Sequence, residues 1–247
     1  MRDDLATLLW KEWRCLARQQ GNRTRVLLTL ATPLLFFGLW FPWESGLGWL
    51  RRGPPSAMPA VVVPLLIVLL TVPDAFAGER ERHTLATLLA SRLPDRTILL
   101  GKLLFAVGLS LVFSLAILVL GLAVANLAHG EGIFLFYSPR ILITDLALGL
   151  LVSLLGAGLG TIISLRSATV QQAQQTLAAI LFLPPTVLGP ILLIVAESRP
   201  QFRLRNLLAG ADPEVAVITI CAVLATIDVL LLWAAHARFR RQRLLER

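Results

Sequence analysis

Two acidic residues stand within otherwise apolar stretches of this sequence, Asp145 and Asp228. A carboxylate in the lipid interior is costly, so each is a candidate contact for an ion, a transported molecule or a neighbouring helix. Asp145 follows Pro139 by less than two helical turns, and an alternative is that it reaches the membrane surface. Asp228 lies deeper in its apolar stretch and could instead bond to a neighbouring helix.

No set of residues in the sequence favours covalent catalysis. His83, His129 and His236 are too scattered to form a Ser–His pair or a metal cluster, and no GxSG motif occurs. Cys15 and Cys221 lack the CxxC spacing of a metal or redox site. We therefore expect no catalytic residues, no bound metal and no enzymatic activity of the chain by itself. An intramembrane protease is the alternative that these observations disfavour.

The elements that must position the two carboxylates are long and apolar. Of the 247 residues, 56% are hydrophobic and 15% are charged, and the mean hydropathy is +0.75. A soluble domain needs more polar surface, and apolar stretches of about 20 residues predict transmembrane helices. The prediction is a single all-α integral membrane domain with six spans, at residues 26–43, 57–76, 98–127, 140–165, 174–195 and 214–235.

Residues 4–19 predict an amphipathic helix on the membrane surface. Its apolar side would carry Leu5, Leu8, Leu9, Trp13 and Leu16, with Lys11, Arg14 and Arg18 opposite. The alternative is an ordinary helix packed on the rest of the protein.

Pro184, Pro185 and Pro190 fall inside the fifth predicted span. They are expected to break or kink it, and in a transporter such a break could line the translocation route. The alternative is a local kink without a functional role.

The distribution of charge predicts the orientation in the membrane. With both termini in the cytoplasm, 17 of the 23 Lys and Arg residues lie on the cytoplasmic side. Six lie outside, namely Arg51, Arg52, Arg140, Arg199, Arg203 and Arg205. The positive-inside rule favours this arrangement, which also requires an even number of spans. Because these charges serve topology and contact lipid headgroups, the net charge of +8 does not indicate binding to nucleic acid.

The segment between the second and third predicted spans has the pattern of a docking helix. It begins with the charge run Glu79–Arg82 and continues with leucines on one helical face until Pro94 ends it. A short amphipathic helix in the cytoplasm is suited to contact with a soluble partner. The alternative is a solvated charge run whose residues pair with each other.

The sequence GERERHTLATLLASRLPDRTILLGKLL, residues 78–104, resembles the loop between the second and third spans of ABC-2-type transporter permeases. Weaker resemblance extends to GLGTIISLRSATVQQAQQTLAAILFLPP, residues 158–185, and to the basic tail ARFRRQRLL, residues 237–245. Together these segments extend over most of the chain, and the first is the most specific.

The resemblance implies a six-span permease that pairs with a second copy or a sister permease in a bacterial-type inner membrane. It implies export driven by two copies of a separate ABC ATPase subunit. ATP and Mg would bind to that subunit, since this sequence contains no GxxxxGK[ST] phosphate loop. A heme-exporter-type permease and a non-ABC six-helix channel or scaffold stay open as alternatives, and the substrate is not predicted.

The resemblance also implies roles for single residues. Carried over by position, docking to the ATPase and coupling to its motion fall on Glu79, Glu81, Thr84, Leu85, Leu88 and Leu89. In that interpretation the carboxylates pair with basic groups of the ATPase and the leucines enter its groove. Residues 4–19 match the connecting helix of the family, which lies beside this docking region.

Overall fold

The computed structural model describes residues 7–14, 23–51, 53–84, 94–130, 132, 134–198 and 213–238, and all regular structure in these ranges is helical. The all-α prediction is confirmed for this part of the chain. Residues 7–14 form a helix. The others are α2 (Arg23–Leu35), η1 (Phe36–Trp40), α3 (Phe41–Ser45), α4 (Gly48–Arg51), α5 (Gly53–Pro73), η2 (Asp74–Gly78), α6 (Glu79–Glu81), α8 (Asp95–His129), α9 (Pro139–Ser164), α10 (Val170–Ser198) and α12 (Pro213–Arg238).

Four of these stretches are long and apolar enough to cross a membrane: Pro55–Glu81, Thr97–His129, Pro139–Ser164 and Val215–His236. The predicted spans 26–43 and 174–195 fall on α2–η1–α3 and on α10, which are not among the four, so the count of six stays a prediction. α8 has 35 residues, about 52 Å at 1.5 Å per residue. It is therefore longer than the apolar core of a bilayer is thick.

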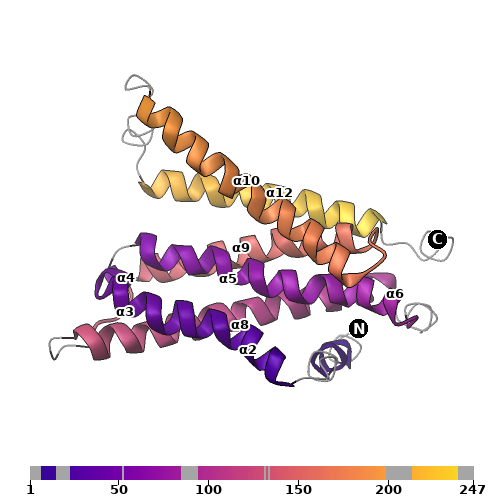
Figure 1. The fold of residues 1–247 in the computed structure, drawn as a ribbon, viewed down its shortest axis with the longest axis horizontal. Helices are drawn as coiled ribbons and strands as arrows, with labels where there is room; N and C mark the ends of the chain where they lie inside the picture. Colours follow the sequence, from indigo (N-terminus) through magenta and orange to yellow (C-terminus); the bar gives the residue numbers. More distant parts are fainter. Residues whose placement is uncertain are drawn as a thin grey trace.

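α5 lies at the centre of a compact block with α8 and α9 (Figure 1). Its contact with α9 is close because α9 places glycines where α5 approaches. A Cβ atom on Gly160 would lie 2.9 Å from Cγ1 of Val72, and one on Gly156 would lie 3.2 Å from Cγ1 of Val68. Small residues at such positions allow helix backbones to approach closely in a membrane. The glycines of this stretch thus serve helix packing.

Replacing Gly160 by alanine is expected to lower stability by about 1–3 kcal/mol, the usual cost of overpacking. The new methyl group would meet Val72 on α5 and Leu177 on α10 at 2.9 and 3.1 Å, and the β-branched Val72 has little rotamer freedom in a helix. Gly108→Ala is the matched control, because nothing lies within 4 Å of its Cβ position. Thermal unfolding in detergent would show equal midpoints for the two variants if the close contact were not present.

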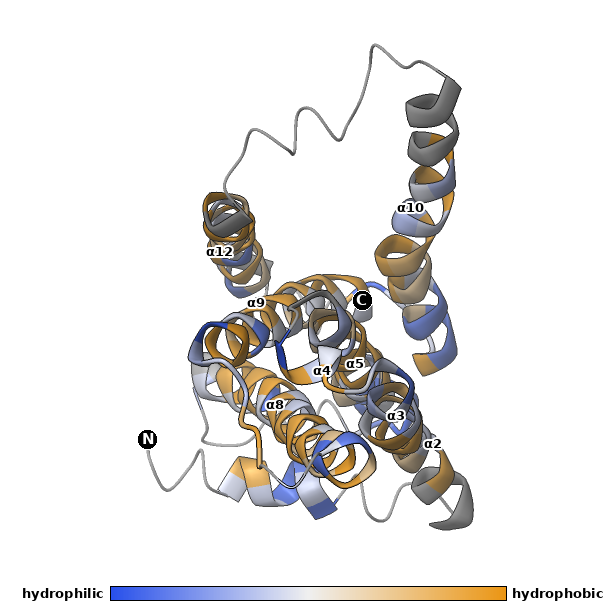
Figure 2. Cartoon of the chain, turned by 90° about the vertical axis from the view of Figure 1, so that its left-hand side faces the viewer, coloured by the Kyte–Doolittle hydropathy of each residue, from blue (hydrophilic) through white to orange (hydrophobic). Residues whose placement is uncertain are grey.

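α10 and α12 lie on one side of this block (Figures 1 and 2). α12 packs on α9, where a Cβ atom on Gly158 would lie 3.0 Å from Cβ of Leu231. α10 buries Ala173 and Leu177 near its start, whereas Leu183 and Leu188 are exposed. Both helices therefore present wide apolar surfaces that the described part of the chain does not cover.

The prolines do not break α10. The helix is continuous from Val170 to Ser198 with Pro184, Pro185 and Pro190 inside it, so of the predicted break or kink the break does not occur, and the kink stays a prediction. Next to the proline pair, the hydroxyl of Thr186 donates to the carbonyl oxygens of Phe182 and Leu183 at 2.8 and 3.0 Å. Hydroxyl groups of this kind help to satisfy backbone acceptors near prolines in membrane helices.

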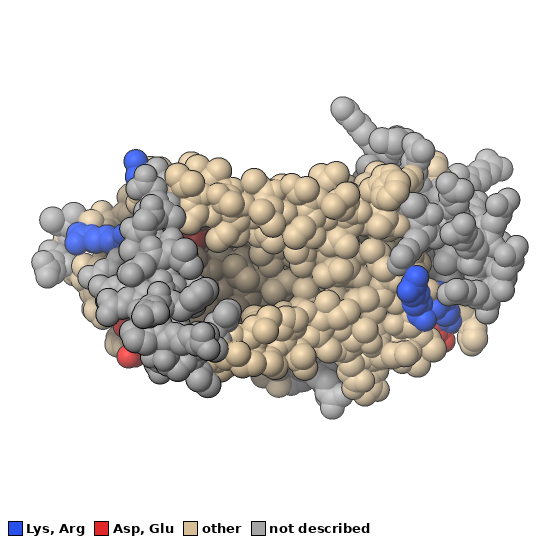
Figure 3. Space-filling model, turned by 90° about the horizontal axis from the view of Figure 1, so that it is seen from above, with Lys and Arg blue, Asp and Glu red and all other residues tan. Residues whose placement is uncertain are grey.

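Charged side chains gather at the two ends of the molecule, and the long face between them is nearly uncharged and hollowed along its length (Figure 3). One end, which we call the α4 end, carries α3, α4 and the end of α8. There the Trp49 Nε1 donates to the Tyr137 hydroxyl at 2.5 Å, which donates to the carbonyl oxygen of Leu118 at 2.8 Å. Burial raises the pKa of the Tyr137 phenol, which keeps this donor neutral.

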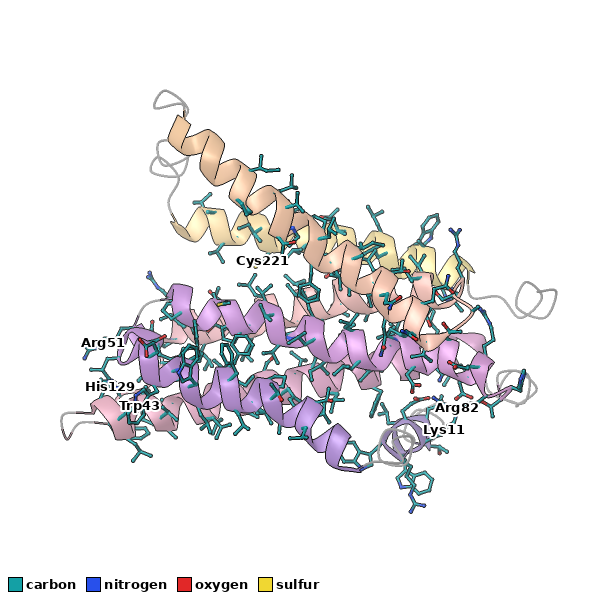
Figure 4. All side chains as sticks on the ribbon, in the orientation of Figure 1. Lys11, Trp43, Arg51, Arg82, His129 and Cys221 are labelled. Atoms are coloured by element: carbon teal, nitrogen blue, oxygen red, sulfur yellow. The ribbon has the colours of Figure 1, made fainter. Side chains whose placement is uncertain are left out.

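The opposite end, which we call the α6 end, carries α6, the start of α8 and the end of α9. The two ends are marked in Figure 4 by Lys11 and Arg82 on one side and by Trp43 and His129 on the other. The rings of Trp43 and His129 are 6.1 Å apart in an edge-on arrangement. We call the nearly uncharged surface between the two ends the uncharged belt. A protein that spans a bilayer needs such a surface, because the lipid interior offers no partners for polar groups.

Candidate functional site

The charge run Glu79, Arg80, Glu81 and Arg82 lies at the α6 end, and we call these four residues the charge hub. It directly follows η2, a π-helical turn of residues Asp74–Gly78. Insertions of this kind are frequent at functional sites. Glu79, Arg80 and Glu81 bond to other segments of the chain, and Arg82 bonds to Asp74 in η2.

Glu79 is 6% exposed, and its carboxylate has partners within its own chain. Lys11, from the helix of residues 7–14, donates to Oε1 at 2.6 Å, and Nζ of Lys102 on α8 lies 3.6 Å from the same oxygen. The Thr84 hydroxyl donates to Oε2. These contacts occupy the carboxylate within the chain, and the pairing of Glu79 with basic groups of an ATPase stays a prediction.

Lys102 is the centre of a buried ion network. Its side chain is 1% exposed, and its ammonium group donates to Oε1 of Glu12 at 2.8 Å and to the carbonyl oxygen of Ala75 at 2.6 Å. Lys11, Glu12, Glu79 and Lys102 therefore form two matched pairs of charges, which joins residues 7–14 to η2–α6 and to α8. Buried charges of this kind are tolerated when they are paired and hydrogen-bonded.

Arg80 binds the end of α9. Its Nη1 donates to the carbonyl oxygen of Ser167 at 2.7 Å and its Nη2 donates to that of Leu165 at 2.9 Å. The last carbonyl groups of a helix lack partners within the helix and carry its negative dipole end, so a cation is favourable there. Arg80 thus acts as a side-chain cap for α9.

Glu81 and Arg82 complete the hub. Glu81 Oε2 accepts a hydrogen bond from the backbone N–H of Val170, the first residue of α10, at 3.2 Å. This places a carboxylate at the positive end of α10, where it is favourable. Arg82 bonds to Asp74, eight residues earlier, with Nη2 at 2.5 Å from Oδ1. Three of the four hub residues therefore connect α6 to other segments, and Arg82 stays within η2–α6.

Ser164 adds a further link between α9 and η2. Its hydroxyl accepts from the N–H of Ala77 at 3.0 Å and donates to the carbonyl oxygen of Pro73 at 3.1 Å. The Ser164 hydroxyl thus takes the place of a direct hydrogen bond between the Ala77 N–H and the Pro73 carbonyl oxygen, in the helical segment that leads into the hub. Sequence reasoning missed this residue, since a serine at the end of an apolar stretch carries no distinguishing signal.

The helix of residues 7–14 packs one side against the rest of the chain. Leu8 and Glu12 are buried, at 2% and 7% exposure, whereas Trp10 and Trp13 are each 58% exposed. That residues 4–19 form an amphipathic helix on the membrane surface stays a prediction. The sequence feature that could have indicated the buried ion network is Lys102, a single lysine near the start of the otherwise apolar third predicted span.

The other predicted site residues lie elsewhere or outside the described residues. Thr84 is described and exposed, whereas Leu85, Leu88 and Leu89 fall in residues 85–93, which the structure does not describe. Asp145 on α9 and Asp228 on α12 are 2% and 3% exposed. Asp145 lies beside Ser56 of α5 rather than at the surface. Pro184 and Pro185 are exposed on α10. Within the described residues, none of Asp145, Asp228, Pro184 and Pro185 contacts the charge hub.

Comparison with known protein families gives a match over most of the chain. The family model described as ABC-2 type transporter matches residues 3–203, a range that includes the charge hub, α8, α9 and α10. No curated protein matches the chain significantly.

Proposed function

Because this chain belongs to the ABC-2 type transporter family, we propose that it is the membrane subunit of an ABC exporter whose ATP hydrolysis takes place on a separate ATPase subunit. Membership makes the chain a transmembrane permease, and proteins of this family typically work with an ABC ATPase. The observation that carries the proposal further is the charge hub. It connects one short segment to residues 7–14, α8, α9 and α10.

The hub suits the transmission of force from an ATPase. In this proposal the segment after Arg82, with Leu85, Leu88 and Leu89, docks on the ATPase, and ATP-driven closure displaces α6. Arg80 and Glu81 then pass the displacement to the end of α9 and the start of α10, and Glu79 passes it to α8. Glu79 therefore acts as a transmitter inside the permease rather than as a contact with the ATPase.

The remaining parts of the proposal follow the family and the charge distribution. Six spans place both termini and the α6 end in the cytoplasm, and the membrane is of the bacterial inner type. Two permease copies, or this chain and a sister permease, enclose the route between them. Two ATPase copies bind ATP and Mg on the cytoplasmic side. Binding of ATP shifts the route between inward-facing and outward-facing states.

The docking step is tested by co-purification of the tagged chain with ABC ATPase subunits from the organism that encodes it. The double variant Leu85→Gln/Leu89→Gln is expected to lose most of the bound ATPase, because it removes the apolar anchors of the docking helix. Leu127→Gln is the matched control, since Leu127 is 87% exposed at the α4 end of α8. Normal ATPase recovery with the double variant, or equal loss with the control, would count against docking at this segment.

A further inference from the structure

Asp228 is a buried acidic residue in a membrane segment, and the described residues do not provide a partner for its charge. It is 3% exposed, and neither carboxylate oxygen has a hydrogen-bond partner among the described residues. It lies ten residues before the end of α12 at Arg238, about 15 Å along the helix axis. A carboxylate at that depth is costly unless it meets a cation or a donor.

The described chain offers Asp228 no such partner. On α12 the nearest basic side chain is His236, eight residues further on. α9, on which α12 packs, has Arg140 in its first turn and Arg166 beyond its last residue. Gly158 of α9 meets Leu231, one turn from Asp228, so Arg166 lies roughly 12 Å further along α9. A cation for Asp228 therefore has to come from outside the described residues.

α12, which carries Asp228, has little contact with the rest of the described chain, so a small displacement of this helix would expose the carboxylate. The helix packs on α9, and of the 18 most apolar consecutive residues in its stretch Val215–His236 only 6% are buried. The two residues that follow Asp228, Val229 and Leu230, are 67% and 61% exposed. A molecule dissolved in the lipid can thus reach α12 laterally, without passing through the packed block of α5, α8 and α9.

From these observations we propose that Asp228 binds the cationic head of a lipid-soluble molecule, a protonated amine or a guanidinium group carrying its own N–H donors. A charge-assisted hydrogen bond in apolar surroundings is stronger than a neutral one, and it satisfies both the carboxylate and the ligand. The apolar part of the ligand lies along the exposed side of α12. This extends the proposed function by naming a class of cargo, but binding itself requires no ATPase.

The binding test uses the purified full chain in phosphatidylcholine nanodiscs and radiolabelled N,N-dimethyldodecylamine as the probe. Asp228→Asn, which keeps the side-chain shape, is expected to weaken saturable binding by at least about tenfold. Asp145→Asn should bind like the wild type, because Asp145 is an equally buried carboxylate with Ser56 beside it. Equal binding by wild type and Asp228→Asn, or equal competition by uncharged dodecanol, would overturn the proposal.

A second measurement needs no substitution. Dicyclohexylcarbodiimide modifies protonated carboxyl groups in apolar surroundings, and mass spectrometry locates the adduct. We expect labelling at Asp228 that the amine suppresses and dodecanol does not, while labelling of Asp145 is unchanged by either. No labelling at Asp228, or equal suppression at both carboxyl groups, contradicts the proposal. Because no ATPase is present, these results are independent of whether the docking segment binds one.

Discussion

Lys102→Met should destabilise the protein by about 3–5 kcal/mol, the usual cost of breaking a buried ion pair by removing one partner. The side chain of Lys102 is 1% exposed, and its ammonium group faces the carboxylates of Glu12 and Glu79, two residues that are 7% and 6% exposed. Without it, Glu12 keeps a buried negative charge with no cation in contact among the described residues. The measurement is the thermal or denaturant midpoint of the purified chain, followed by intrinsic fluorescence.

Three comparison variants separate charge from size in this prediction. Lys102→Arg keeps the charge and should retain most of the stability. Lys11→Met should cost less than Lys102→Met, since the Lys11 side chain is 37% exposed and solvent screens it. Glu12→Gln/Lys102→Met removes both charges of one pair, and its loss should be smaller than the sum of the single losses. Additive losses would mean that Glu12 and Lys102 do not interact as the structure places them.

Arg80→Gln should separate ATP hydrolysis from movement of the membrane helices, if the proposed function is correct. Arg80 bonds α6 to the end of α9 through the carbonyl oxygens of Leu165 and Ser167, and glutamine cannot reach both with a charged fork. The variant should still bind its ATPase, because the docking leucines are unchanged. The expected loss of coupling is about tenfold, typical of a coupling free energy of 1–2 kcal/mol.

The readout is the ATP-induced change in distance between spin labels at positions 127 and 188, with Cys15 and Cys221 replaced. Leu127 is exposed at the α4 end of α8, and Leu188 is exposed on α10, so the labels report relative movement of the two helices. Arg82→Gln is the matched control, since Arg82 bonds to Asp74 within the same helical segment. An unchanged ATP response in Arg80→Gln, or equal loss in Arg82→Gln, would show that the hub does not transmit the movement.

The two experiments address different properties of one arrangement. The buried network of Lys11, Glu12, Glu79 and Lys102 holds residues 7–14 against α8 and α6, so its loss is expected to appear as instability. Arg80 and Glu81 lie at the edge of that network and contact the adjoining ends of α9 and α10. Their loss is expected to appear as weaker coupling in a folded protein. A permease needs the stable ion network as well as the contacts of Arg80 and Glu81, because those contacts can transmit a displacement only if α6 is held firmly in place.

Some features of the fold follow from local sequence alone. Long apolar stretches predict membrane helices because the hydrophobic contribution of each residue adds along the chain. Pro139 and Pro213 each begin a helix, α9 and α12, as expected of proline in a first turn. The same local view fails for α10, where the prolines interrupt hydrogen bonds without breaking the helix.

The sequence by itself determined that the chain is helical, apolar enough for a membrane, and charged between its second and third apolar stretches in the manner of its family. Only the tertiary structure decided what those charges do. The most distant partners of Glu79, Arg80, Glu81 and Lys102 lie 68 to 90 residues away in the sequence, and no periodicity or motif encodes a pairing over such a separation. A charge run with the sequence pattern of solvent-exposed residues therefore connects helices in the folded protein. Folding brings residues 7–14, α8, α9 and α10 into contact with it.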